Sequence, residues 1–314
     1  MNALFGPLRR LTWLLPLLLL TACATEAPVR LYPDVTPPRA EAIQVVRKAD
    51  HPVVALALGS GGVRGFAHIA VIKVLEANQI PVDIVVGTSV GSVVGALYAG
   101  GYQAQALEQL ALQLDEKQIK DYSWSKRSIY GGERLQDFIN ESLKNRDIEQ
   151  LDKPFAAIAT ELQHGRMMVF NRGNTGLAVR ASSSIPGIFE PPAFNGSEYV
   201  DGDLKNPIPV SVARSMGADV VIAVDISQRP EDFPDNSDII DVLKQSIRIM
   251  RQSILADEIK EATVVIRPTV RATSLDFDQE LKQRMFQAGE EAAAAALPHI
   301  QEALRQAGLR KRPH

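Results

Sequence analysis

A serine lies in the pentapeptide Gly87-Thr88-Ser89-Val90-Gly91, where its hydroxyl could act as a nucleophile. The apolar run Val82–Val86 before it predicts a buried strand, and Val90–Ala99 after it predicts a helix. In a sharp strand-to-helix turn of this kind, glycines let the serine hydroxyl project from the strand end and let the helix pack close behind it. The helix N-terminus then directs its dipole and its free N–H groups at the reaction centre. The pattern therefore predicts Ser89 as a nucleophile, and a merely packed strand-to-helix turn is the alternative.

A glycine-rich run, Gly59-Ser60-Gly61-Gly62-Val63-Arg64-Gly65, follows an expected strand over Val53–Leu58 and opens an expected helix over Phe66–Ala77. Its backbone N–H groups would lie beside Ser89 if the two strands are neighbours, and they could then stabilise the oxyanion of an ester under attack. The competing interpretation is a phosphate-binding loop. The glycines do not follow the G-x-G-x-x-G spacing from Gly59, and no Gly-Lys-Ser/Thr follows, so we favour an oxyanion hole.

Three motifs together resemble the signatures of patatin-like phospholipases, in the order in which that family has them. They are Leu58–Gly65, Gly87–Gly91 and Asp201-Gly202. The similarity extends from about Val53 to Asp225 and includes Ala181–Gly187 and Pro191-Pro192. The resemblance implies an α/β fold of the patatin-like type, with three α/β/α layers around a mostly parallel central sheet.

The same resemblance implies a Ser–Asp dyad without a catalytic histidine. Ser89 would be the nucleophile, Asp201 the residue that orients and deprotonates it, and the N–H groups around Gly61 and Gly62 the oxyanion hole. The implied reaction is hydrolysis of an acyl ester, of the phospholipase A or lysophospholipase type, through an acyl-Ser89 intermediate. An acyltransferase on the same fold, or a catalytically silent envelope lipoprotein that binds a lipid or a protein, are the alternatives. We expect neither a cofactor nor a metal, because the acids in Pro230–Asp235 lack the ligand spacing of an EF-hand loop.

Two residues depart from the family pattern. Ser60 stands where many members have glycine, and Asp203 stands where the family usually has glycine or alanine. A carboxylate this close to Asp201 could raise the pKa of that residue by repulsion, but we leave Asp203 outside the catalytic set. Arg64 could bind a phosphate headgroup, although a structural arginine that pairs with a carboxylate and fixes the loop is slightly favoured.

The five histidines offer no clear relay for Ser89. A Ser-His-Asp hydrolase of the common α/β type has its histidine after the acid, where only His299 and His314 stand, and both are expected at the surface. His68 is expected to be an ordinary residue of the first helix. His164 lies in an expected hairpin turn, and it keeps acyl transfer open as an alternative.

Along the rest of the chain, apolar runs alternate with helical patterns, which predicts a mostly parallel sheet covered on both faces. Further strands are expected over 155–162, 167–171, 219–225 and 263–268. Further helices are expected over 103–114, 133–143, 239–258 and 279–306. Without an internal repeat or a second linker, residues 51–310 are expected to form one hydrolase domain.

The N-terminus has the order of a secretory signal: Arg9 and Arg10, the apolar run Leu11–Leu20, then Thr21 and Ala22. A membrane-spanning helix is less favoured, because the run is about half the ~20 residues that a bilayer needs. We therefore expect residues 1–22 to be a signal peptide.

Leu20-Thr21-Ala22-Cys23 resembles the bacterial lipobox, which implies that Cys23, the only cysteine, carries acyl chains such as palmitate. Ala24 after it implies sorting to the outer membrane, facing the periplasm. Residues 23–50, with Thr36-Pro37-Pro38, would be the lipidated cysteine and a flexible tether.

Removal of residues 1–22 takes away two arginines, so the formal charge changes from −3 to −5. This balance argues against a nucleic-acid partner, and no basic run is longer than Arg310-Lys311-Arg312. The expected partners are a phospholipid or other acyl-ester substrate and a membrane held through Cys23. The pattern predicts no oligomeric state.

Overall fold

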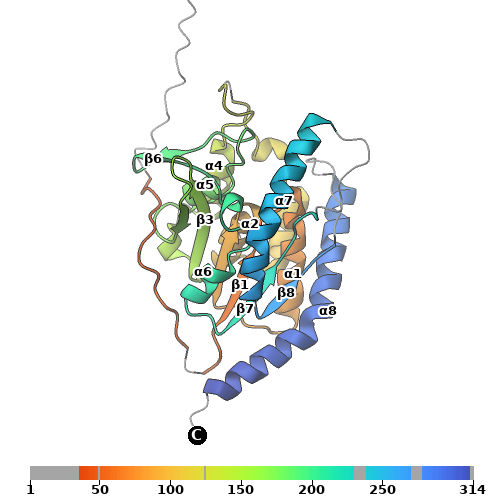
Figure 1. Cartoon of the computed structure of the whole chain (residues 1–314). Helices are drawn as coiled ribbons and strands as arrows, with labels where there is room; N and C mark the ends of the chain where they lie inside the picture. Colours follow the sequence, from red (N-terminus) through yellow and green to blue (C-terminus); the bar gives the residue numbers. More distant parts are fainter. Residues whose placement is uncertain (1–34, 49, 124, 230–237, 270–277, 312–314) are drawn as a thin grey trace, which may run out of the picture.

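The computed structural model describes residues 35–48, 50–123, 125–229, 238–269 and 278–311 (Figure 1). The predicted signal peptide, Cys23, the acids of residues 230–235 and His314 lie outside these residues. Among the described residues, no helix is both long enough and apolar enough to cross a bilayer.

The centre of the molecule is a sheet whose main part is parallel (Figure 1). Its parallel strands stand in the order β3 (Phe155–Glu161), β2 (Ile84–Thr88), β1 (Val54–Leu58), β7 (Val220–Val224) and β8 (Val264–Ile266). Three further strands complete the sheet: β4 (Met167–Phe170) and β6 (Ser197–Asp201) run antiparallel to β3, and β5 (Ala193–Phe194) pairs with β6. The predicted mostly parallel sheet is therefore confirmed.

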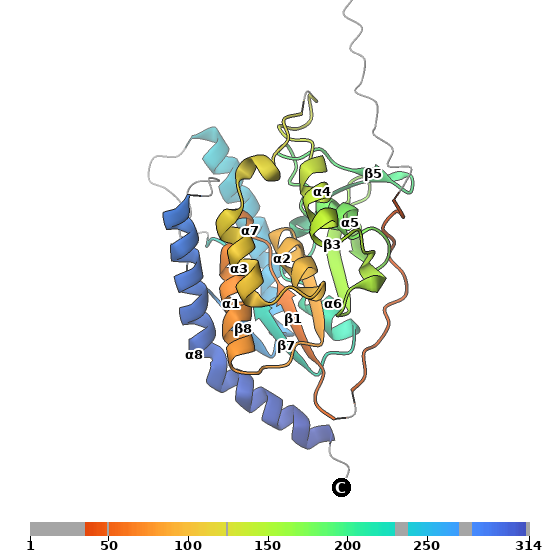
Figure 2. The ribbon, with the colours of Figure 1, turned by 180° about the vertical axis from the view of Figure 1, so that it is seen from behind.

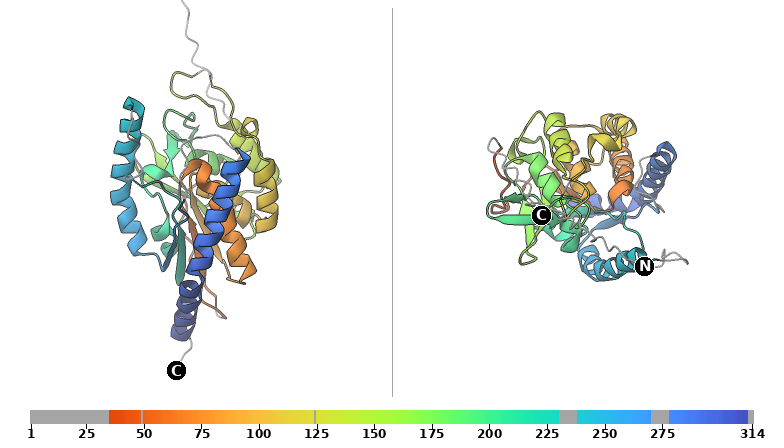
Figure 3. Two further views of the ribbon diagram at one scale, coloured as in Figure 1. Left: turned by 90° about the vertical axis from the view of Figure 1, so that its right-hand side faces the viewer. Right: turned by 90° about the horizontal axis from the view of Figure 1, so that it is seen from above.

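Helices cover both faces of the sheet, which gives three layers (Figures 2 and 3). One face carries α1 (Phe66–Ala77), α2 (Val90–Ala99), α3 (Ala104–Gln113), α4 (Glu133–Ser142), α5 (Thr175–Ser182) and α8 (Gln279–Lys311). The other face carries α6 (Val210–Ser215) and α7 (Ile239–Lys260). The alternation along β1 explains the two cores, because Leu56 and Leu58 pack under α1 and α8, whereas Ala55 and Ala57 pack with Leu255 of α7.

Three short pieces are absent from the sequence-based prediction: α5, α6 and the β5–β6 hairpin. Helix α5 is only eight residues long and contains Gly176, so its pattern is weak; a hydrogen bond from the Leu177 N–H to the Asn174 side chain caps it. Strand β6 reads Ser-Glu-Tyr-Val-Asp, with only two apolar residues. Such pieces form because of their tertiary contacts rather than their local pattern.

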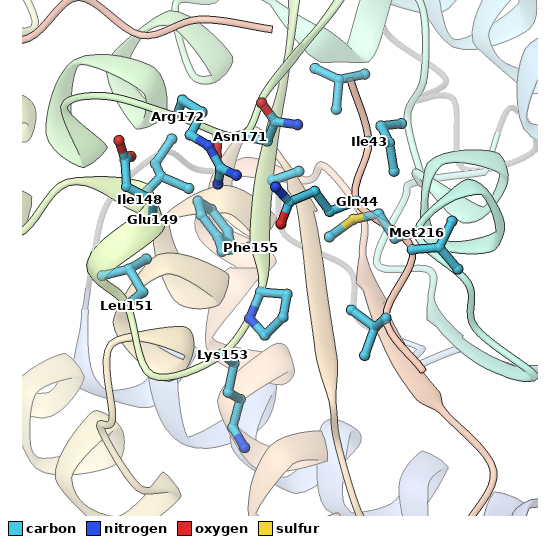
Figure 4. Close-up of a pocket in the computed structure, with 15 residues that line it drawn as sticks. Ile43, Gln44, Ile148, Glu149, Leu151, Lys153, Phe155, Asn171, Arg172 and Met216 are labelled. Carbon is cyan, nitrogen blue, oxygen red and sulfur yellow. The ribbon is translucent and has the colours of Figure 1, made fainter. Parts of the chain in front are cut away.

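The described part of the predicted tether, residues 35–48, lies along the domain. Its backbone hydrogen-bonds to the domain at both ends: the Asn174 N–H donates to the Thr36 carbonyl at 2.8 Å, and the Val46 N–H donates to the Met216 carbonyl at 2.8 Å. The segment borders a pocket of about 360 Å³, into which Figure 4 shows Ile43, Met216 and Phe155 directed. Phe155 begins β3, so this pocket lies near the amino ends of the parallel strands, away from Ser89 at the carboxyl end of β2.

Candidate active site

Ser89 occupies a sharp turn between β2 and α2. Its backbone has φ of 55° and ψ of −128°, a conformation that non-glycine residues rarely adopt and that costs about 1–3 kcal/mol. The flanking glycines allow it, because a Cβ on Gly87 would lie 2.3 Å from the Gly91 carbonyl oxygen and a Cβ on Gly91 would lie 2.1 Å from the Leu58 carbonyl oxygen. The turn therefore has the sharp strand-to-helix geometry that the pentapeptide predicts.

Hydroxyl groups hold the strained turn in place. The Ser89 N–H donates to Ser182 Oγ at 2.9 Å, and Ser92 Oγ donates to the Ser89 carbonyl at 2.7 Å. Ser182 is not among the predicted site residues, but it ends α5 and touches the backbone of the candidate nucleophile. Its signal was faint: it is one of three adjacent serines in the stretch that resembles the family, and none has a motif of its own.

Asp201 lies at the end of β6, directly beside the elbow. Ser89 Oγ donates to Asp201 Oδ2 at 2.6 Å, and both residues are buried. The other carboxylate oxygen accepts the Asp203 N–H at 2.8 Å. The Asp201 backbone is fixed as well, because its N–H donates to the Ser184 carbonyl at 2.9 Å and its carbonyl accepts Thr160 Oγ1 at 3.0 Å. The two residues of the predicted dyad are thus in direct, oriented contact.

Gly202 explains how the acid comes so close to the elbow. A Cβ at this position would lie 2.2 Å from the Ile158 carbonyl oxygen and 3.0 Å from Thr88 Cγ2. Only a residue without a side chain lets the chain after Asp201 pass so close to β3 and to the end of β2. The Asp-Gly pair therefore has a structural reason.

The environment of Asp201 makes it a stronger base than an ordinary aspartate. Burial, and then the neighbouring negative charge of Asp203, raise the pKa of Asp201 from 3.8 to about 7. The hydrogen bonds from Ser89 and the Asp203 N–H, and the charge of Arg251, act in the opposite direction. A pKa near neutrality suits a group that must take up and release a proton during a reaction.

The glycine-rich loop lies against the elbow, as predicted. A Cβ on Gly65 would lie 2.2 Å from Val90 Cγ2, the residue that follows Ser89. Gly61 is packed on Ile226, since its Cβ would lie 2.6 Å from that side chain, and Gly62 has a φ of 58°. Strands β1 and β2 are neighbours, so the two strand-to-helix turns meet at the same edge of the sheet.

The N–H groups of this loop divide into two sets. Those of Gly59 and Ser60 donate to the carbonyls of Val224 at 3.1 Å and Pro207 at 2.9 Å. Within the described part of the chain, the N–H groups of Gly61 and Gly62 have no such backbone partner. These two donors are therefore free to bind an oxyanion.

Ser60 and Asp203, the two residues that depart from the family pattern, contact each other. Ser60 Oγ donates to Asp203 Oδ1, and Arg251 of α7 lies with its Nε 2.7 Å from the same carboxylate oxygen. Arg251 Nη2 also donates to Ser60 Oγ at 2.6 Å and to the Ser60 carbonyl at 3.1 Å. The cluster Ser60/Asp203/Arg251 thus joins the glycine-rich loop, the loop after the dyad acid and α7, a link that sequence reasoning did not predict.

Among the described residues, Arg64 hydrogen-bonds to a backbone carbonyl rather than to a carboxylate. Its Nε donates to the Ile226 carbonyl at 2.6 Å. Burial, and then the charges of Arg251 and Arg248, lower the pKa of Arg64 to about 10, so the residue stays positively charged at neutral pH.

Both His68 and His164 have partners other than Ser89. His68 is fully buried with its Nε2 2.8 Å from the Gly59 carbonyl oxygen, and burial lowers its pKa to about 4, which keeps it neutral. His164 lies in the turn between β3 and β4, with Nδ1 2.9 Å from Glu161 Oε1, and His299 is exposed on α8. The Ser89 hydroxyl itself donates to Asp201.

The chain is similar to known proteins in sequence and in fold. Residues 56–214 match the family model described as patatin-like phospholipase. The chain belongs to this family. It is 36% identical over 188 residues to an uncharacterized NTE family protein of Mycobacterium tuberculosis, across 58% of this chain and 51% of that protein. It is 38% identical over 186 residues to patatin-like phospholipase domain-containing protein 7 of Rattus norvegicus, across 57% of this chain and 14% of that protein.

The chain thus spans about half the length of the mycobacterial relative and a small part of the rat protein. Among solved structures, VipD of Legionella pneumophila superposes with a TM-score of 0.54 at 11% identity, over 85% of this chain and 71% of that chain. This likeness concerns the fold.

Proposed function

We propose that this protein hydrolyses carboxylic esters of lipids, of the phospholipase A or lysophospholipase type, with a Ser89–Asp201 dyad. The observation that carries the proposal is the 2.6 Å hydrogen bond from Ser89 Oγ to Asp201 Oδ2, made by a strained serine whose turn packs against the glycine-rich loop. A relay through histidine is not needed, because the raised pKa of Asp201 lets it accept the serine proton directly.

The reaction proceeds in two halves. Ser89 Oγ attacks the ester carbonyl carbon while its proton moves to Asp201, and the N–H groups of Gly61 and Gly62 stabilise the oxyanion. When the tetrahedral intermediate collapses, the proton on Asp201 passes to the leaving alcohol and acyl-Ser89 remains. Water then loses a proton to Asp201 and attacks the acyl carbon. Collapse of the second tetrahedral intermediate breaks the bond to Ser89 Oγ, which takes the proton back from Asp201, and the fatty acid is released.

Arg64 is the proposed contact for a phosphate in the substrate. It is charged, belongs to the loop that carries the oxyanion donors, and has Arg248 and Arg251 as neighbours that add positive potential. An acyltransferase would share every step as far as acyl-Ser89 and would replace water by an acceptor alcohol. Product analysis with and without a lysolipid acceptor separates the two.

The test compares Ser89→Ala and Asp201→Ala with the wild type on a soluble p-nitrophenyl acyl ester and on a phospholipid. Each variant should lose activity by about 10³-fold or more, because members of a catalytic unit act together. Ser215→Ala is the matched control, since its hydroxyl only caps the Val212 carbonyl of α6. Full activity in Ser89→Ala would refute the proposal, and a folded wild type that a fluorophosphonate does not label at Ser89 would favour the silent lipoprotein.

Acylation of Cys23 is a second, separate proposal, together with a place on the outer membrane facing the periplasm. It rests on the lipobox-like Leu20-Thr21-Ala22-Cys23 and on Ala24. Metabolic labelling with an alkyne analogue of palmitate should mark the wild type and leave Cys23→Ser unmarked. Equal labelling of both would show that Cys23 is not the acylated residue.

A further inference from the structure

Helix α7 stands with its first half at the catalytic edge of the sheet. It follows β7, whose carboxyl end lies beside that of β1, and Figure 1 shows it running from this edge back along the sheet. Arg251, in the middle of the helix, contacts Asp203 and Ser60. The residues before Arg251 therefore lie at the rim of the candidate active site.

This first half exposes a broad apolar surface. Six large apolar side chains are between 49% and 78% exposed: Ile239, Val242, Leu243, Ile247, Ile249 and Met250. At 100° per residue they cover an arc of about 160° on the outer side of the helix. We call these six residues the α7 face.

The second half of α7 packs against the rest of the domain. Leu255 belongs to the core under the sheet, and the Glu258 carboxylate accepts the Ser211 N–H at 2.8 Å and the Ser211 hydroxyl at 2.7 Å. The large exposed apolar side chains of α7 are thus confined to the half of the helix that reaches the catalytic edge. A soluble monomer rarely leaves so large an apolar surface without a use for it.

Further exposed apolar residues lie near this rim on other parts of the chain. Leu204, three residues after Asp201, is 44% exposed. Tyr122 and Ile129, in the segment between α3 and α4, are 82% and 49% exposed, and this segment projects at the same end of the molecule (Figures 1 and 2). The apolar surface therefore surrounds the site on more than one side.

The charge on this half of α7 selects between possible occupants. Between Ile239 and Gln252 there are three basic residues, Lys244, Arg248 and Arg251, against the single acid Asp241. Arg251 is held by Asp203, whereas the side chain of Lys244 is 62% exposed and complements anionic lipid headgroups. A basic helix with a broad apolar face is the type that lies in a bilayer interface.

We propose that the α7 face binds the surface of a phospholipid bilayer that contains anionic lipid, with its apolar side chains at the level of the acyl chains. The catalytic edge then faces the membrane, so that a lipid ester can reach Ser89 without crossing bulk water. This inference rests on the proposed lipolytic function for its purpose, but the contact itself can be measured without catalysis.

Hydrogen–deuterium exchange of the full chain tests the contact directly. The Ser89→Ala protein, which consumes no lipid, is compared with and without vesicles of phosphatidylethanolamine and phosphatidylglycerol. Amides within residues 239–250 should exchange at least fivefold more slowly with vesicles, whereas those of α8 should not change. An N-terminal acyl anchor alone would bring the protein to the vesicle without protecting α7.

A pair of variants in the active protein links the contact to function. Leu243→Asp/Met250→Asp places two charges on side chains that are 60% and 63% exposed, and Leu309→Asp places one on a side chain of α8 that is 55% exposed and far from the site. The double variant should hydrolyse vesicle phospholipid at least tenfold more slowly and a soluble short-chain ester at the wild-type rate. Leu309→Asp should leave both rates unchanged.

The outcomes distinguish binding of the α7 face to the bilayer from hydrolysis of the ester. Unchanged exchange of residues 239–250 on bound vesicles overturns the inference, as does protection that grows with protein concentration in the absence of lipid, which would indicate a contact between copies. Equal loss of both activities in the double variant also counts against it. Protection of α7 in a protein that hydrolyses neither ester would uphold the membrane contact and refute the proposed hydrolase.

Discussion

Asp203→Asn is the sharpest test of the way in which the site sets the pKa of its base. The substitution removes the negative charge and keeps an oxygen that can accept from Ser60 and Arg251. The pKa of Asp201 is raised from 3.8 to about 7 by burial first and by Asp203 second. Without that charge, and with Arg251 still present, the pKa of Asp201 should fall.

The size of the effect follows from the interaction of neighbouring charges. A decrease of about one pH unit corresponds to ~1.4 kcal/mol, a moderate value for two charges at the edge of a protein. At pH 6 the ionised fraction of Asp201 would then increase from about one tenth to about one half. Because kcat/KM follows the ionised base of the free enzyme, it should be about fivefold higher at pH 6 and unchanged at pH 8.5 or above.

The assay is kcat/KM for a soluble p-nitrophenyl ester between pH 5 and 9, read at the isosbestic wavelength of the product. A soluble ester avoids effects of pH on lipid packing. Asp257→Asn is the matched control, because Asp257 is a well-exposed acid of α7 that pairs with Lys260 and lies away from the site. If the pH below which kcat/KM declines is the same in Asp203→Asn as in the wild type, or is higher, then Asp201 is not a base whose pKa Asp203 raises.

Three further predictions concern stability and the identity of the base. Gly202→Ala should lower the free energy of unfolding by about 1–3 kcal/mol, because its Cβ would lie 2.2 Å from the Ile158 carbonyl oxygen; wild-type stability in urea denaturation would contradict this. The folded-state pKa of Asp201 is raised, so its contribution is present below about pH 4 and is lost as the pH rises through 7. Asp201→Asn should therefore be more stable than the wild type above pH 7, by at most about 4 kcal/mol, and thermal unfolding at pH 5 and pH 8 measures whether that gain is smaller at the lower pH. His68→Gln should lower stability by about 1–3 kcal/mol through its contact with the Gly59 carbonyl and leave the acid limb of kcat/KM in place; a displaced limb would make His68 a participant.

The parts of the fold that the sequence predicts are those encoded locally. Strands β1 and β2 are buried on both faces, so they appear as unbroken apolar runs, and the turns after them need glycine for contacts that any side chain would block. The long helices α7 and α8 have enough turns for a periodic pattern. Ser89, Gly61 and Gly62 could be located because each belongs to such a local motif.

The parts that were not predicted depend on contacts between distant segments. Ser182 reaches the Ser89 N–H across 93 positions of the chain, and Arg251 reaches Ser60 across 191. Neither Ser182 nor Arg251 belongs to a sequence motif, because a single hydrogen bond does not constrain which residues stand next to it in the chain. Residues 35–48 were expected to be a tether for the same reason, since the bond of Val46 to Met216 has no local signature.

Ser60 and Asp203 deviate from the family pattern at two distant positions of the sequence, but in the fold they belong to one cluster. Taken singly, each replaces a small residue of the family pattern by a polar one near a catalytic centre. In the fold, Ser60 and Asp203 bind each other and Arg251. Asp203 therefore both raises the pKa of Asp201 and neutralises the charge of Arg251 on α7. Arg64 already lies beside Arg248 and Arg251, and removal of Asp203 would leave this positive charge less compensated next to the oxyanion donors. Ser60 and Asp203 are therefore best understood as a unit that joins Arg251 of α7 to the proposed oxyanion loop and to the loop after the proposed base.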